Sequence, residues 1–171
     1  TNFLKTENVV EMNAQASTII TSLSNVENTY NNAVIEMQSN SSALGDIKNE
    51  LNKRDPKATD YYESRITDPY VTELQSEIAR LEIQRDLAKT GNEEIIKDSR
   101  SLRELNNKIS GLKSTLNEKL EILKNNASSN TPEELRALTG RYFEAKVSSS
   151  QDKIRVNLLK SYLGKFQQKY D

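Results

Sequence analysis

The stretch VVEMNAQASTIITSLSNVENTYNNAVIEMQSNSSALGDIKNEL, residues 9–51, decides the fold. Apolar side chains return in it at alternating steps of three and four residues, through six consecutive heptads. An ideal α-helix drifts against a strict seven-residue repeat, so this stripe predicts a helix over about 5–52 that supercoils against a partner helix. Its members are Val9, Met12, Ala16, Ile19, Leu23, Val26, Tyr30, Ala33, Met37, Asn40, Leu44, Ile47 and Leu51.

Asn40 is the polar member of this stripe, and two interpretations of it stay open. A buried Asn at a seam position can determine the register and the oligomeric state of a coiled coil. The other interpretation is a solvated gap in the seam. Asn40 is therefore a candidate interaction residue.

A second apolar repeat recurs at every seventh residue from 74 to 123. Its companions change sides: Val71 and Ile78 flank it early, and Leu105 and Leu112 flank it late. At the change, Gly91 could end one helix and Asn92 could cap the next, which would form a hairpin. Because the repeat continues through this point, we favour one helix over about 69–126 with a possible break at 90–92. The repeat consists of Leu74, Leu81, Ala88, Ile95, Leu102, Ile109, Leu116 and Leu123.

Residues 53–68 are expected to form a linker between these two helices. The residue before a proline avoids helical geometry, and Asp55-Pro56 and Asp68-Pro69 bracket the segment. Asp68 suits an N-cap and Pro69 the first helical position. Three tyrosines lie in or next to this linker and are candidates for an interface at the tip, although packing of the linker onto the helix ends is the favoured interpretation. They are Tyr61, Tyr62 and Tyr70.

A third helix is expected over about 132–170. Thr131-Pro132-Glu133-Glu134 has the form of a capping box with Pro at the first position. The apolar stripe behind it is interrupted around Ser148–Asp152, where we expect the loosest or most hydrated packing. The stripe consists of Leu135, Leu138, Tyr142, Ala145, Ser149, Asp152, Val156, Leu159, Leu163, Phe166 and Tyr170.

Together these elements predict an all-α fold, a three-helix elongated bundle of long antiparallel coiled-coil helices. Short connections favour antiparallel neighbours, so residues 1–171 should form a single elongated segment. Three rods would place the N- and C-termini at opposite ends. Both terminal stripes run almost to the chain ends, and we expect the natural polypeptide to continue beyond them.

Composition argues against most chemical functions. The chain has no Cys and no His, which removes disulfides, thiolate zinc sites and imidazole catalysis. Its net charge is −1, so it carries no strong field toward nucleic acid. The carboxylates mostly alternate with Lys and Arg at helical spacing, which is typical of solvated faces. We expect no enzyme, no cofactor, no metal site and no nucleic-acid partner.

The segment from Asn52 onward resembles a known family. Asn52-Lys53-Arg54-Asp55-Pro56 and then DPYVTELQSEIARL, residues 68–81, are similar to the periplasmic coiled-coil region of bacterial polysaccharide co-polymerases, which are chain-length determinant or exopolysaccharide transport proteins. The likeness continues through Leu105–Leu123 and Tyr142–Lys146 and covers about two thirds of the chain. The two membrane helices of that family and its proline-rich motif lie outside this sequence.

The resemblance implies a periplasmic localisation, as part of a bacterial inner-membrane protein whose membrane contact lies in flanking segments. It further implies self-association around a polysaccharide polymerase or export machine, and a role in the chain length or export of lipopolysaccharide or exopolysaccharide. It transfers no individual site residue. Two alternatives remain: the helical hairpin of a periplasmic adaptor in a secretion or efflux system, and a generic coiled-coil tether.

Overall fold

The computed structural model describes residues 2–66, 68–89, 99–128 and 131–170. All five of its elements are helices, and the described residues contain no strand, which confirms the all-α prediction. The prediction of coiled-coil supercoiling stays a prediction. The helices are α1 (Asn2–Arg54), α2 (Ala58–Ile66), α3 (Pro69–Lys89), α4 (Ser99–Ser128) and α5 (Glu133–Tyr170).

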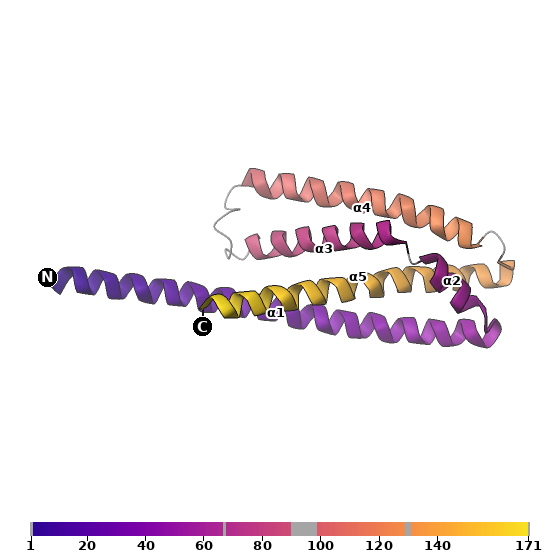
Figure 1. Ribbon diagram of the computed structural model, residues 1–171, viewed down its shortest axis with the longest axis horizontal. Coiled ribbons are helices and arrows are strands. Elements are labelled where there is room, and N and C mark those ends of the chain that lie inside the picture. Colours follow the sequence, from indigo (N-terminus) through magenta and orange to yellow (C-terminus); the bar gives the residue numbers. More distant parts are fainter. Residues whose placement is uncertain (1, 67, 90–98, 129–130, 171) are drawn as a thin grey trace.

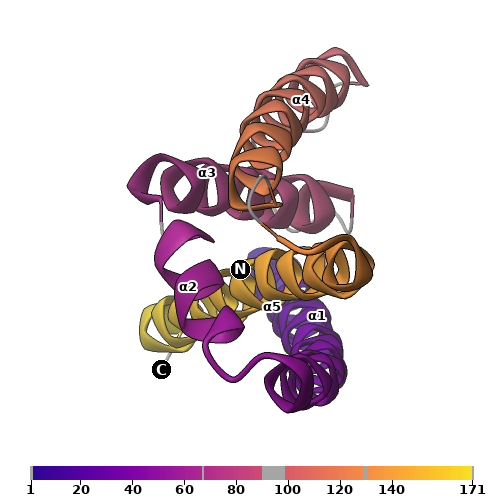
Figure 2. The same cartoon turned by 90° about the vertical axis from the view of Figure 1, so that its right-hand side faces the viewer.

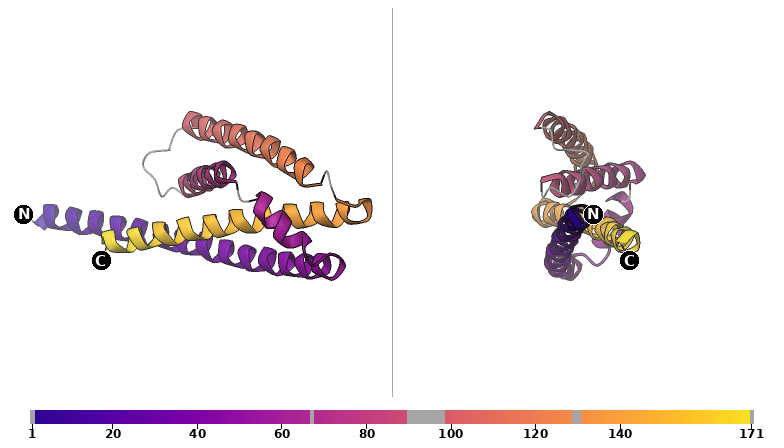
Figure 3. Two further views of the ribbon diagram at one scale, coloured as in Figure 1. Left: turned by 45° about the vertical axis from the view of Figure 1, so that its right-hand side comes forward. Right: turned by 90° about the vertical axis from the view of Figure 1, so that its left-hand side faces the viewer.

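The longest helices, α1 and α5, pack side by side in opposite directions (Figure 1). The first predicted stripe faces this contact, because its members from Ile19 to Leu51 are all buried or half-buried. Ala16, by contrast, is exposed, and the N-terminal part of α1 extends past the end of α5 (Figure 3). The 53 residues of α1 correspond to a length of about 80 Å.

The favoured prediction of one continuous helix over 69–126 is wrong. The chain reverses between α3 and α4, which lie next to each other as a hairpin (Figure 1). Val71, Leu74 and Ile78 of α3 form one buried cluster with Leu116 of α4. Leu112, Leu120 and Leu123 pack against that cluster. The possible break at 90–92 lies outside the described residues.

The error has a physical cause. The apolar side chains of a seven-residue repeat can be buried in two ways. They can pack against a separate helix, or the chain can fold back so that the second half of the repeat packs against the first half. Leu74 and Leu81 are buried on α3, and Ile109 and Leu116 are buried on α4, so both halves of the repeat face apolar neighbours. The informative signal was the change of companions from Val71 and Ile78 to Leu105 and Leu112. The change indicates that the two halves of the repeat bury different faces, so they can be two separate helices with different axes.

An ion pair across the hairpin provides a test of this arrangement. Lys113 Nζ lies 2.6 Å from Glu82 Oε1, and the Glu82 side chain is only 10% exposed. We expect Lys113→Met to lower the free energy of unfolding by about 1–3 kcal/mol, because it leaves a buried carboxylate without its donor. Adding Glu82→Gln should recover much of that loss. In a continuous helix these residues would stand about 46 Å apart, so strictly additive effects in urea unfolding would contradict the hairpin.

The predicted linker 53–68 contains a helix that the sequence reading missed. Residues 58–66 form α2, which lies across the end of the α1–α5 pair (Figure 2). The buried Thr59 hydroxyl donates to Asn52 Oδ1 over 2.7 Å, which connects α2 to α1. The prediction for Asp68 is confirmed, because Asp68 Oδ1 accepts a 2.8 Å hydrogen bond from the Tyr70 N–H at the start of α3. The last helix begins at Glu133, one residue later than expected.

The extra reversal also overturns the expected position of the termini. With α1, α3, α4 and α5 running alternately, the described N- and C-terminal ends lie toward the same end of the molecule (Figure 1). Seen along the rod, α3 lies on α5 and α4 lies outermost on α3 (Figure 2). The expected three-helix bundle is thus a helix pair with a hairpin stacked on it. The opposite end, where α1 turns into α2 and α5 begins, is called the tip below.

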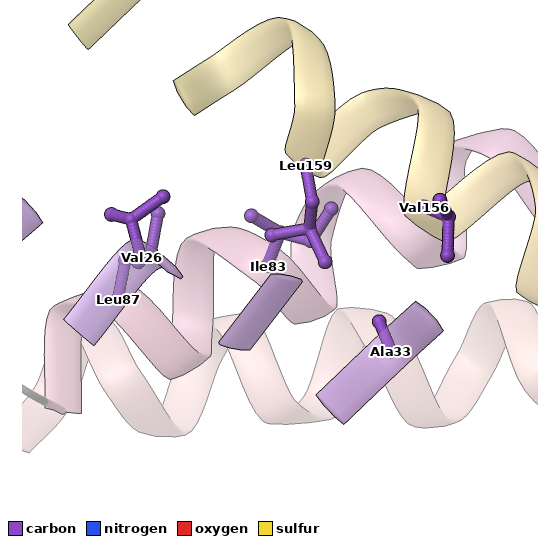
Figure 4. Close-up of a cluster of buried hydrophobic side chains, with 6 residues drawn as sticks. All are labelled: Val26, Ala33, Ile83, Leu87, Val156 and Leu159. Carbon is purple, nitrogen blue, oxygen red and sulfur yellow. The ribbon is translucent and has the colours of Figure 1, made fainter. Parts of the chain in front are cut away.

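A buried cluster joins the hairpin to the pair (Figure 4). Leu159 of α5 and Val26 of α1 are both 0% exposed, and Leu87 of α3 is 1% exposed. Each of three helices therefore contributes completely buried side chains to one core. The members are Val26, Ala33, Ile83, Leu87, Val156 and Leu159.

Candidate functional site

The tip is built on a buried aromatic cluster. Tyr142 of α5 is 0% exposed and packs with apolar side chains from α1, α2 and α5. The hydroxyls of Tyr62 and Thr131 hydrogen-bond to each other, which connects α2 to the segment before α5. Their burial requires such a pairing, because an unsatisfied hydroxyl in this core would destabilise it. The cluster consists of Leu51, Tyr62, Leu138, Tyr142 and Phe143.

A single carboxylate, that of Glu63 on α2, holds the three helices of the tip together. Glu63 Oε1 accepts hydrogen bonds from Lys48 Nζ of α1 at 3.0 Å, and from Tyr142 Oη at 2.9 Å and Lys146 Nζ at 3.3 Å of α5. The hydrogen bond from Lys48, followed by that from Tyr142, lowers the pKa of Glu63 to about 2, against the opposing effect of desolvation. Desolvation and then the Glu63 carboxylate raise the pKa of Tyr142. The charged form of Glu63 therefore stabilises the folded tip.

This pKa shift predicts how the stability depends on pH. The folded-state pKa of Glu63 lies below its usual value of 4.5. Its contribution is therefore complete above about pH 5 and is lost as the pH falls toward 2. Because the side chain is 35% exposed, we discount the shift for screening and expect Glu63→Gln to cost about 1–2 kcal/mol at pH 7. The difference from the native chain should shrink steadily between pH 5 and 2 in urea titrations. Glu118→Gln, at an exposed position, is the control, and a difference independent of pH would contradict the assignment.

The three tyrosines predicted as interaction residues lie at or near the tip but differ in exposure. Tyr62 is buried in the cluster, which matches the packing interpretation. Tyr61 is 38% exposed, and its ring meets that of Tyr62 edge to face with centroids 5.3 Å apart. Tyr70, at the start of α3, is 48% exposed. Tyr61 also lines an open groove of about 340 Å³, together with Pro132, Leu135 and other residues of the tip. A role for these tyrosines in binding stays a prediction.

Asn40 contacts α5 of its own chain. Its side-chain amide donates to Asp152 Oδ2 over 2.8 Å and to Ser148 Oγ over 3.5 Å. The polar residues of the third stripe therefore lie opposite the polar residue of the first stripe. This pairing favours the interpretation that Asn40 determines the register between α1 and α5 over the interpretation that it lies in a solvated gap. The loosest or most hydrated packing that we expected here does not hold at Ser149, which is 1% exposed. Whether Asn40 affects the oligomeric state stays a prediction.

The polar level extends to α3, where Gln75 is 1% exposed. Gln75 Nε2 donates to the Val147 carbonyl oxygen over 3.1 Å, and its Oε1 accepts from the Ser150 hydroxyl over 3.3 Å. The neighbouring Ser149 hydroxyl is also buried and has no partner. Three helices therefore place polar side chains at the same height, and such a layer penalises any sliding of one helix along another.

Asn40→Leu tests this layer. The substitution removes the donor that faces Asp152, so we expect a loss of about 1–2 kcal/mol in the free energy of unfolding. The double variant Asn40→Leu with Asp152→Leu restores a matched apolar contact and should regain at least the native stability. Equal losses in the single and the double variant, measured by chemical unfolding, would contradict the pairing.

The described residues hold no group of three or more acidic residues placed to bind a metal ion. None of the described helices has both the length and the hydrophobicity that a bilayer crossing requires. The described ion pairs lie mostly at the surface within one helix or between neighbouring helices.

Fold and surface define an elongated all-α protein with a packed tip. No protein-family model, curated protein or solved structure matches the chain.

Sequence reasoning missed the residues that organise the tip and the polar layer. Glu63 lay inside a presumed linker, and no local pattern distinguishes it from other acidic residues. Gln75 was detectable in principle, since it sits directly beside Leu74 and three residues before Ile78 on a buried face. Its partners on α5, however, are more than 70 residues away in the sequence.

Proposed function

We propose that this chain is the periplasmic helical scaffold of a polysaccharide co-polymerase-like protein, involved in the chain-length control or export of lipopolysaccharide or exopolysaccharide. The observation that carries the proposal is the hairpin-like course of the whole rod, with both described ends toward one end and a packed tip at the other. A segment held by membrane helices on both sides requires this geometry. The resemblance in residues 68–81 supplies the process and the compartment.

The physical properties of the rod support a scaffold. Its length of about 80 Å along α1 suits a spacer that carries contacts far from an anchor. The Glu63 contacts and the buried tyrosines keep the tip in one arrangement, so that a partner meets a preformed surface. Under this proposal the partners are further copies of the chain and a glycan polymerase or export machine.

The experiment is a replacement in the full-length parent protein. Residues 1–171 are exchanged for an unrelated two-stranded coiled coil of equal length, and the glycan length distribution is compared on gels. We expect the modal length or the exported amount to change. As a finer test, Glu63→Gln should change it in the same direction, while Glu118→Gln should not. An unaltered glycan after the full exchange would refute the proposal.

Localisation is tested separately. Alkaline phosphatase, which folds to its active form only in an oxidising compartment, is inserted in the parent protein after Asn126, near the tip. We expect activity in intact cells. Activity of a reporter that works only in the cytoplasm, placed at the same position, would contradict a periplasmic site.

A further inference from the structure

Charged residues are distributed unevenly between α1 and α5. Residues 6–47 contain five acidic residues and no Lys or Arg, while residues 153–170 contain five basic residues and no Asp or Glu. Because Asn40 lies opposite Asp152 and the helices are antiparallel, residues 153–170 run beside roughly residues 22–39 of α1, so an acidic segment of α1 lies next to a basic segment of α5. The residues are Glu7, Glu11, Glu27, Glu36 and Asp46 on α1, and Lys153, Arg155, Lys160, Lys165 and Lys169 on α5.

Several of these charges are exposed and uncompensated. Glu27 and Glu36 on α1, and Lys160 and Lys165 on α5, are exposed and form no ion pair within the described part of the chain. Other interhelical charges, such as Arg155 and Asp86, are paired across the α3–α5 contact. The unpaired charges therefore lie on outward faces, where a second molecule can reach them.

The basic segment of α5 also borders an apolar groove. It lies between α3 and α5, has a volume of about 340 Å³, and is lined by Ile83, Leu87 and Leu158 together with Lys165. Arg80 also lines it, although its guanidinium is held by Glu77 at 2.8 Å. A side chain that fills this groove should therefore be aliphatic and should stand next to a carboxylate.

The acidic segment of α1 carries both kinds of side chain. Ile35 is 64% exposed, and Glu27, eight residues earlier, is also exposed and lies about two turns along the helix and roughly 80° around it. The heights also agree. Asn40 and Asp152 lie at the same height along the rod. Because α1 and α5 are antiparallel, Ile35 is level with about Leu158, and Glu27 is level with about Lys165.

We infer that α1 of one copy docks into the α3–α5 groove of a second copy, with Ile35 against Leu158 and Glu27 against Lys165. The two copies stand side by side in the same orientation without a shift along the rod. Because the two surfaces differ, the contact is heterologous and repeats from copy to copy, closing into a ring or continuing as a filament. The inference rests on the proposed scaffold function and names the surface through which its copies associate.

Sedimentation velocity of the 171-residue chain tests the contact. We expect assembly at about 50 mM salt that weakens at least tenfold at about 0.5 M, because the exposed charges are screened. Glu27→Lys and Lys165→Glu should each weaken it at least tenfold, since each places like charges opposite each other. The double variant Glu27→Lys with Lys165→Glu exchanges the charges and should restore assembly. Ile35→Ser should weaken assembly at both salt concentrations.

The controls separate this contact from other causes. Glu118→Lys changes an exposed charge on α4 in the same way and should leave assembly intact. Circular dichroism should show unchanged helicity in every variant, because the substituted positions are exposed. A chain that stays monomeric at low salt, or a double variant as weak as the single ones, would overturn the inference. A chain that assembles as described but leaves glycan length unaffected would overturn only the proposed function.

Discussion

Tyr142→Ala should lower the free energy of unfolding by about 3–5 kcal/mol, because it removes a completely buried aromatic ring and leaves a cavity at the centre of the tip. The loss combines two effects. The ring packs in a cluster to which α1, α2 and α5 all contribute, and the hydroxyl donates to Glu63. For a chain of this size the melting temperature should fall by about 10 °C.

Tyr142→Phe separates the two effects. It keeps the ring and removes only the hydroxyl, while Lys48 and Lys146 still pair with Glu63, so the expected loss is about 1 kcal/mol. Tyr70→Ala is the matched control at a position where the ring is 48% exposed, and it should cost much less than Tyr142→Ala. Chemical unfolding followed by circular dichroism measures all three. Similar losses for Tyr70→Ala and Tyr142→Ala would contradict the packing described here.

Leu159→Ala should cost about 3–4 kcal/mol, for a different reason. Leu159 is completely buried where α5 meets both α1 and α3 (Figure 4), so no single helix can move to fill the cavity. Because α3 belongs to the hairpin, the loss should also weaken the attachment of the hairpin to the helix pair. Limited proteolysis should then cut within α3 faster in the variant than in the native chain.

Ile20→Ala is the control for Leu159→Ala. Ile20 lies on α1 and is 67% exposed, so the same reduction in side-chain volume should change the stability by less than about 0.5 kcal/mol. A loss at Ile20 comparable to that at Leu159 would show that the outer face of α1 is covered in solution.

The first and last long helices and the start of α3 could be predicted from local patterns. The stripe from Ile19 to Leu51 is buried or half-buried throughout, Asp68 caps α3 as expected, and the third helix differs by one residue at its start. The polar residues that interrupt the third stripe lie opposite Asn40, the polar member of the first stripe, but the loose or hydrated packing expected there does not hold at Ser149, which is 1% exposed. These features depend on residues a few positions apart, which the sequence places together directly.

The position of the reversal and the site residues could not be predicted in the same way. The repeat from Leu74 to Leu123 is satisfied by a straight helix and by a hairpin, so only the packing of α4 back onto α3 decides between them. Glu63 at the tip is held by hydrogen bonds from Lys48 and Tyr142. Gln75 in the polar layer is held by hydrogen bonds with α5. These partners lie on other helices.

The sequence by itself therefore determined that the chain is helical and which face of each helix is apolar, because periodicity reports how hydrophobic side chains are distributed around a helix axis. Only the tertiary structure decided which helix covers each face, where the rod folds back, and that both ends lie toward one end of the molecule. The reason is that burial of an apolar stripe is favourable against any matching surface. The choice among such surfaces depends on shape and polar pairing between residues distant in the chain.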